Sequence, residues 1–138
     1  MNDDVERLVR EERVREAAEL AEQQGDLALA SALFERACDF ERAAEMSYRS
    51  LGFERALLLA VQAKSDAIAT LALAKLDPGS PSLNRVGPLL VSRGDYGWAA
   101  RVFEKDGKLA EAGDAWEKDR DGVRAAVLYE RMGDVVKA

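Results

Sequence analysis

Apolar side chains recur along this chain with a period of 13 residues. Its last part aligns as three units, 95–107, 108–120 and 121–133, in which the fifth place is always alanine. Within a unit, apolar residues gather at places 2, 5, 6 and 9, the spacing of an amphipathic helix. The pattern therefore predicts one short helix in each unit. The same spacing extends through the first half, so nine alanines fall in register: Ala17, Ala30, Ala43, Ala56, Ala69, Ala99, Ala112, Ala125 and Ala138.

Residues that favour helix ends and helix starts alternate at the unit boundaries. Place 13 holds Gly25, Gly94, Gly107 and Gly133, where a left-handed residue can end a helix. Place 1 then carries residues whose side chains cap a helix N-terminus. Each boundary is thus predicted to be a tight turn. The capping residues are Asp26, Asp39, Ser65, Ser82, Asp95, Asp121 and Asp134.

The alignment predicts about nine helices and a C-terminal stub of five residues. The first helix is expected to be longer, from about Asp4 to Gln24, and Pro88 is expected to delay or kink the helix that begins at Ser82. Helices of about 10 residues are marginal alone in water, so they must stack on their neighbours. The predicted fold is all-α, a single solenoid domain over 1–138 of antiparallel short helices, with arrays at 1–76 and 82–138 and an inserted loop at 77–81.

Segments 25–37 (GDLALASALFERA) and 94–105 (GDYGWAARVFEK) resemble tetratricopeptide-type repeats. The resemblance covers nearly the whole chain and implies a right-handed α-solenoid that serves as a protein-binding scaffold. Two units here total 26 residues instead of 34, which is closer to the short-helix solenoids of clathrin-like and coat-complex proteins. The family's clamp for chaperone tails uses paired asparagines and lysines, and because only Asn2 and Asn84 occur here, no clamp residue is transferred.

Composition excludes most familiar chemistry. The 138 residues include no histidine and one cysteine, which removes the usual neutral-pH acid/base, the commonest zinc ligand and any internal disulfide. We therefore expect no catalytic residues, no cofactor and no metal. The formal net charge of −6 and the lack of a basic block make nucleic acid and anionic membranes unsuitable partners. Without a secretory signal or an apolar stretch of bilayer length, the expected location is the cytoplasm.

Places 4 and 11 lie outside the apolar stripe and are the candidate partner-binding positions. The predicted surface is a basic ridge with an aromatic anchor, suited to an acidic or carboxylate-bearing segment of another protein. In the alternative interpretation, the arginines pair with nearby glutamates or offset helix dipoles, and Trp98 is buried against the loop at 78–81. Trp116 and Tyr129, at place 9, are assigned to the core between helices. The candidate binding residues are Trp98, Arg42, Arg49, Arg55 and Arg124.

A strong repeat without a catalytic constellation indicates a non-catalytic scaffold or adaptor that binds another protein or peptide segment. The alternative is a structural spacer or self-assembly segment of a larger multidomain protein, which associates through the apolar C-terminal repeat near Val135 and Val136. In either case, a further hypothesis is that the chain is a fragment of a longer array, because it stops within a 13-residue unit.

Overall fold

The computed structural model describes residues 3–137, with side chains up to residue 133. These residues form ten α-helices and no strand, so the predicted all-α class is confirmed. The chain divides into two compact units, Met1–Lys75 and Leu76–Ala138. The first unit holds α1 (Asp3–Arg10), α2 (Val14–Gln23), α3 (Leu27–Arg36), α4 (Phe40–Arg49), α5 (Phe53–Ala63) and α6 (Asp66–Ala74). The second unit holds α7 (Pro81–Ser92), α8 (Tyr96–Lys105), α9 (Leu109–Lys118) and α10 (Gly122–Lys137).

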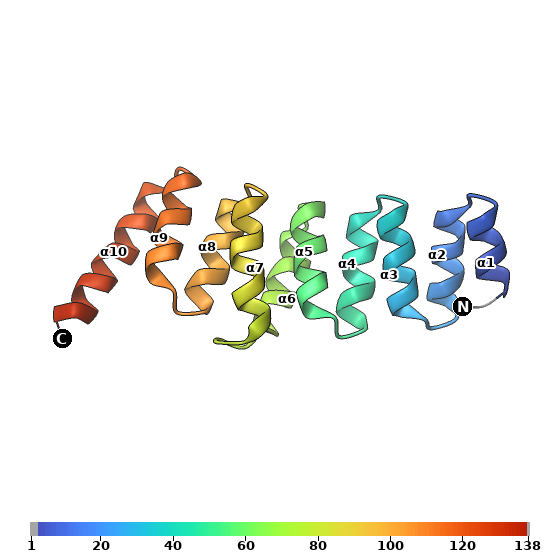
Figure 1. Ribbon diagram of the computed structural model, residues 1–138, viewed down its shortest axis with the longest axis horizontal. Helices are drawn as coiled ribbons and strands as arrows, with labels where there is room; N and C mark the ends of the chain where they lie inside the picture. The colour runs from blue at the N-terminus through green and yellow to red at the C-terminus, as the bar shows by residue number, and fades with distance from the viewer. Residues whose placement is uncertain (1–2, 138) are drawn as a thin grey trace. The chain divides into compact units, whose positions relative to one another are not determined.

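Within each unit, a helix packs mainly against the helices next to it in the chain (Figure 1). The alanines at the fifth place form the centre of these contacts. All eight of them within the described residues are buried, from Ala17 to Ala125, whereas Ala138 lies outside the described residues. This burial confirms the predicted register. A small side chain at this place lets neighbouring helix axes approach closely.

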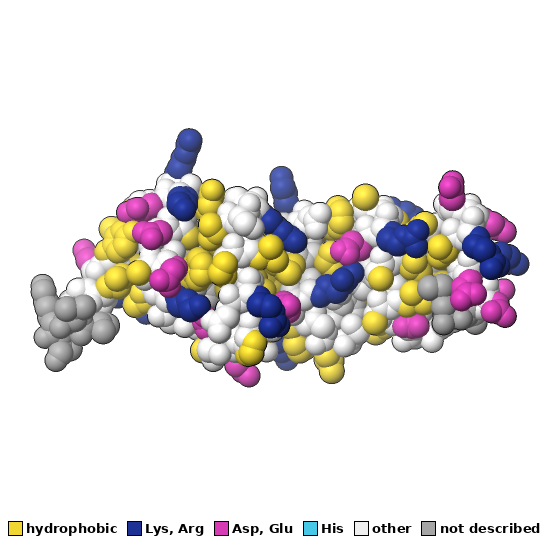
Figure 2. Space-filling model, in the orientation of Figure 1, with side chains coloured by type: hydrophobic (Ala, Val, Ile, Leu, Met, Phe, Trp, Pro, Cys, Tyr) yellow, Lys and Arg dark blue, Asp and Glu magenta, His cyan; other side chains and the backbone are white. Residues whose placement is uncertain are grey.

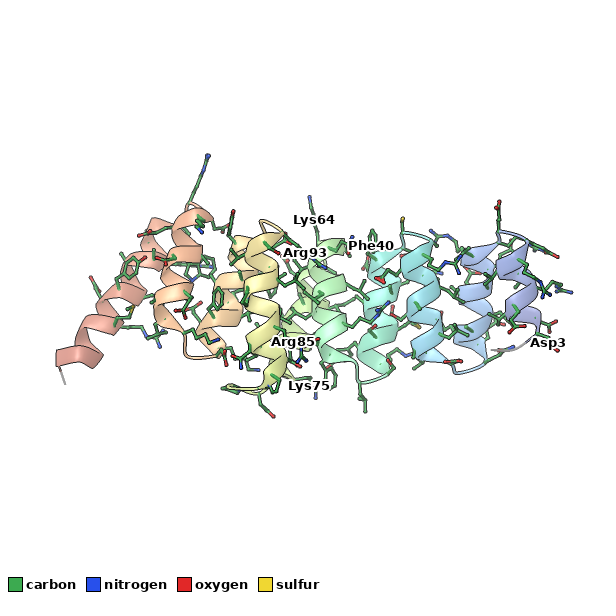
Figure 3. The ribbon with its side chains drawn as sticks, viewed as in Figure 1. Asp3, Phe40, Lys64, Lys75, Arg85 and Arg93 are labelled. Atoms are coloured by element: carbon green, nitrogen blue, oxygen red, sulfur yellow. The ribbon has the colours of Figure 1, made fainter. Side chains whose placement is uncertain are left out.

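Most of the tight turns share one backbone conformation. The residue at place 13 has a positive φ, and the N–H of the following residue donates to the carbonyl of place 9, which is the Schellman helix end. Glycine takes this position at Gly25, Gly94 and Gly107, as predicted, but non-glycine residues take it elsewhere. One of them is Lys64, which follows α5 and extends away from the helices (Figure 3). The others are Glu12, Cys38, Leu51 and Arg120.

The predicted single helix from Asp4 to Gln24 is wrong, because it is broken into α1 and α2. Glu12 has a φ of 61°, and the N–H of Arg13 donates to the carbonyl of Leu8 at 2.9 Å, so the same Schellman turn occurs here. Glu12 lies 13 residues before Gly25 and so occupies place 13. The described residues accordingly form ten helices instead of the predicted nine.

Two other expected helix boundaries differ in the second unit. Gly133 does not end a helix, since α10 continues through it to Lys137 and there is no separate stub in the described residues. The helix expected from Ser82 begins earlier, because Ser80 is its N-cap and accepts a hydrogen bond from the N–H of Leu83 at 3.3 Å. Pro88 lies inside α7, so it does not delay the start of this helix.

Pairs of residues 16 apart make close contacts between consecutive helices. The hydroxyl oxygens of Ser31 on α3 and Ser47 on α4 are 2.6 Å apart, and both side chains are buried. In the second unit, Gly87 lies against the ring of Phe103, and Gly113 lies against the ring of Tyr129. Place 6 of one helix thus faces place 9 of the next. A glycine at place 6 makes room for a ring at place 9.

Candidate functional site

No group of three or more acidic or cysteine side chains within the described residues is placed to hold a metal ion. In the same part of the chain, no helix is long and apolar enough to cross a membrane. The features with recognisable binding chemistry are the surfaces between a helix and the second helix after it.

Three of the predicted binding arginines form ion pairs that join one helix to the second helix before it. These side chains are about half exposed, a setting in which an ion pair contributes about 0–1 kcal/mol to stability. On the face that Figure 2 shows, Lys and Arg side chains are interspersed with Asp and Glu. The pairs are Arg42 with Glu19 at 3.3 Å, Arg49 with Glu22 at 3.4 Å, and Arg55 with Glu35 at 2.7 Å.

The other two predicted residues lie in the second unit. Arg124 of α10 stacks on the Trp116 ring, 4.5 Å from its centroid, and also pairs with Asp121 at 3.3 Å. Trp98 of α8 is half-buried, and the guanidinium of Arg101 lies 4.6 Å from the centroid of its ring. The five predicted residues are therefore divided between the units: Arg42, Arg49 and Arg55 belong to the first unit, and Trp98 and Arg124 to the second.

Arg124 lines a groove of about 430 Å³ that we call the Trp116 groove. Its floor is Trp116 of α9, which is 3% exposed and confirms the prediction of a core position. One wall comes from α8 and the other from α10. The lining residues are Arg101, Glu104, Trp116, Val123, Arg124, Val127 and Leu128. Val123 and Val127 are 77% and 51% exposed.

The Trp116 groove has a counterpart in the first unit, between α2 and α4. There Arg42 stacks on Phe34 with 5.4 Å to the ring centroid, as Arg124 stacks on Trp116. Arg42 also reaches Glu19, which lies 23 residues before it. The residue 23 before Arg124 is Arg101, so the acid of the first unit is replaced by a second guanidinium.

The second cross-groove pair of the first unit is also missing from the Trp116 groove. Glu22 pairs with Arg49, which is 27 residues later, and the corresponding residues are Glu104 and Arg131. Glu104 instead accepts a hydrogen bond from the indole N–H of Trp116 at 3.2 Å. A phenylalanine floor cannot donate such a bond, because its ring has no N–H. The tryptophan therefore holds the acid against the floor, and no ion pair between Glu104 and Arg131 is found among the described side chains.

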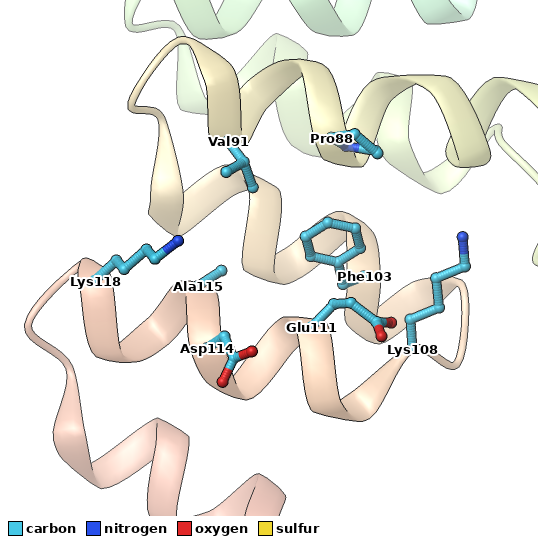
Figure 4. A pocket seen from close by; sticks show the side chains of 8 residues that line it. All are labelled: Pro88, Val91, Phe103, Lys108, Glu111, Asp114, Ala115 and Lys118. Atoms are coloured by element: carbon cyan, nitrogen blue, oxygen red, sulfur yellow. The ribbon is translucent and has the colours of Figure 1, made fainter.

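A second open groove, which we call the Phe103 groove, lies between α7 and α9 and has a volume of about 440 Å³. Pro88 and Val91 occupy the α7 positions where Glu19 and Glu22 stand in α2. Figure 4 shows the Phe103 ring between these two residues and α9. Pro88 and Val91 therefore offer no acid that could pair with a cation of α9. The α9 side contributes Lys108, Glu111, Asp114, Ala115 and Lys118.

Tyr129 was predicted to be a core residue, but it is 37% exposed. Its ring lies against Gly113, and its hydroxyl donates to the carboxylate of Asp114 at 3.0 Å. Part of the ring therefore stays open to solvent, on the helix with which the described chain ends. The assignment to the core is wrong, although the contact with the preceding helix is the one expected for place 9.

The phenol of Tyr129 is expected to ionise at unusually high pH. Desolvation, followed by the hydrogen bond to Asp114, raises its pKa to about 12, above the value of about 10 for an unperturbed tyrosine. Because the folded-state pKa is the higher one, the stability that this phenol contributes is present below pH 10 and is lost between pH 10 and 12. Absorbance titration of tyrosinate should show a step near pH 12 that Tyr129→Phe removes. A step left unchanged by this substitution would contradict the assignment.

No protein-family model, no curated protein and no solved structure matches this chain. The candidate site therefore rests on the chemistry of the two grooves. The ridge prediction missed Arg101, Val123 and Val127, because only places 4 and 11 were considered. A comparison of place 7 between the 13-residue repeats would have indicated Arg101, since a glutamate stands at this place in α2.

Proposed function

We propose that this chain is a non-catalytic protein-interaction module that binds a segment of another protein in the Trp116 groove of its second unit. The observation that carries the proposal is the contrast between the units. Cross-groove ion pairs cover the floor between α2 and α4, whereas the Trp116 groove is left open with Val123 and Val127 exposed. Exposed apolar residues beside a tryptophan and arginines are typical of protein interfaces.

The proposed framework is a tetratricopeptide-like, right-handed α-solenoid of antiparallel short helices. Its support is the 13-residue period, the repeated Schellman turns, and the packing of each helix against its sequence neighbours. A regular framework of this kind repeats its contacts from one 13-residue repeat to the next, so differences at places 4, 7 and 10 can determine which grooves are open.

The test is selection of binding peptides from a displayed library of random 16-residue sequences, followed by fluorescence anisotropy with the best peptide. Val127→Glu should weaken binding at least tenfold, because it puts a carboxylate on the apolar wall of the Trp116 groove. Leu71→Glu is the matched control, since Leu71 of α6 is 52% exposed but lies in the first unit. Failure to select any peptide would reject the proposed function, as would equal losses in the two variants.

A second candidate function is self-assembly through α10. The exposure of Val123, Val127 and Tyr129 on this helix favours it, because a second copy could cover these side chains. Light scattering after size exclusion, over a wide concentration range, separates the two functions. A monomer at all concentrations is expected for the peptide-binding module. Growth into dimers or longer stacks that Val123→Glu abolishes would support assembly instead.

A further inference from the structure

We infer that the Trp116 groove selects a peptide segment in which a carboxylate is followed or preceded by an aliphatic side chain. The inference rests on the proposed function and specifies the chemistry of the partner. The carboxylate would be bound by Arg101 and Arg124. The aliphatic side chain would be bound by Trp116, Val123 and Val127.

Arg101 stands at a place where the first unit has an acid. In the first unit, Glu19 occupies the corresponding place of α2. It pairs with Arg42, the arginine that stacks on Phe34, and this ion pair spans the groove. In the second unit, the residue at that place is Arg101, which lines the same groove as the stacked Arg124. Two like charges in one groove repel each other, and an anion bound between them relieves this repulsion.

Among the described residues, no acidic side chain forms an ion pair with Arg101, whose guanidinium lies 4.6 Å from the centroid of the Trp98 ring. The groove's single acid, Glu104, is one turn away on the same helix but is held by the indole N–H of Trp116. Arg124 has Asp121 as a partner on its own helix, which leaves further N–H donors for a ligand.

The ligand chemistry follows from these groups. A carboxylate can accept charge-assisted hydrogen bonds from both guanidinium groups, which are planar and matched to carboxylate geometry. The floor and the α10 wall are apolar, so they favour an adjacent aliphatic side chain that removes Val123 and Val127 from water. By contrast, the charged residues that line the Phe103 groove balance each other, with Lys108 and Lys118 beside Glu111 and Asp114, and its α7 wall is apolar.

The experiment uses three displayed libraries of 12-residue peptides on the full chain. Each library has a fixed sixth residue, which is Glu, Gln or Lys, and random residues other than Asp and Glu elsewhere. We expect the Glu library to be enriched at least tenfold over the Gln library, with aliphatic residues selected next to the acid. The Lys library should yield no peptides that bind the Trp116 groove.

The best peptide is then tested on variants by fluorescence anisotropy. Arg101→Glu restores the acid that the first unit has at this place, so Arg124 gains an internal partner and affinity should fall at least tenfold. Lys118→Glu makes the same change of charge in the Phe103 groove and should alter affinity less than twofold. Circular dichroism verifies that both variants are folded, and Arg101→Gln, expected to weaken binding at least fivefold, provides a variant without a new charge.

The outcomes separate the two proposals. Equal enrichment of the Glu and Gln libraries would overturn the carboxylate inference while the peptide-binding function stands. Equal losses of affinity in Arg101→Glu and Lys118→Glu would also overturn it. The attraction between peptide and protein would then depend on the total charge of the protein and not on Arg101. If none of the libraries yields a binding peptide, both the inference and the proposed function fail.

Discussion

Replacing Ala112 by phenylalanine should destabilise the second unit by about 3 kcal/mol, the upper end of the usual cost of overpacking a core. Ala112 is fully buried at the fifth place of α9, where small side chains let the helices approach closely. A phenyl ring at this point can be accommodated only if α9 moves away from its neighbours. For a unit of this size, the transition midpoint should fall by about 12 °C or more.

Urea and thermal unfolding followed by tryptophan fluorescence measure this effect selectively. Both tryptophans of the chain, Trp98 and Trp116, lie in the second unit, whereas circular dichroism reports the helices of both units. Ala110→Phe is the matched control, because Ala110 is exposed on the same helix and its replacement should cost no more than about 0.5 kcal/mol. If Ala112→Phe unfolded with the parent midpoint, Ala112 could not lie at a close helix contact.

The repeat was predictable because its physical causes are local. A buried alanine every 13 residues and an amphipathic spacing around it determine which face of each helix is buried. The break at Glu12 was missed because glutamate and arginine are good helix formers, and neither glycine nor proline marks the turn. The error at Gly133 is the reverse case, since a glycine within a helix costs only about 1 kcal/mol and packing can offset it.

The grooves were harder to predict because they depend on pairs of residues in different helices. The ion pair between Arg42 and Glu19 becomes visible only when α2 and α4 are known to lie side by side. The role of Trp116 is a further example. Its place predicted burial correctly, but its hydrogen bond to Glu104, which holds this carboxylate against the groove floor, depends on the tertiary structure.

These pairs explain how one repeat can carry different surfaces. Buried places 5 and 6 set the spacing of the helices, while places 4, 7 and 10 lie along the groove walls and are largely free of that constraint. At place 7, Glu19 of α2 pairs with Arg42 across its groove, whereas Arg101 of α8 cannot form such a pair with Arg124. The residues that set the helix spacing therefore differ from those that line the grooves.

The contact between Gly87 and Phe103 should make a glycine-to-alanine substitution unusually harmful. Alanine in place of glycine normally stabilises a helix by about 0.5–1 kcal/mol. Here the added Cβ would lie 2.5 Å from Cε1 of Phe103, whose ring is buried and only 6% exposed. Gly87→Ala should therefore destabilise the second unit by about 1–2 kcal/mol, measured by urea unfolding with tryptophan fluorescence.

A double-mutant cycle tests whether this cost arises from the contact itself. Phe103→Ala alone should cost about 3–5 kcal/mol, but it removes the ring that the Cβ would meet. In that background, Gly87→Ala should become stabilising by about 0.5–1 kcal/mol, so the coupling between the two sites should be about 1.5–3 kcal/mol. Gly133→Ala in α10 is the matched control, because nothing lies within 4 Å of its added Cβ and the substitution should stabilise. A coupling near zero would mean that the ring of Phe103 does not fill the space left by Gly87, and that these two helices pack in another register.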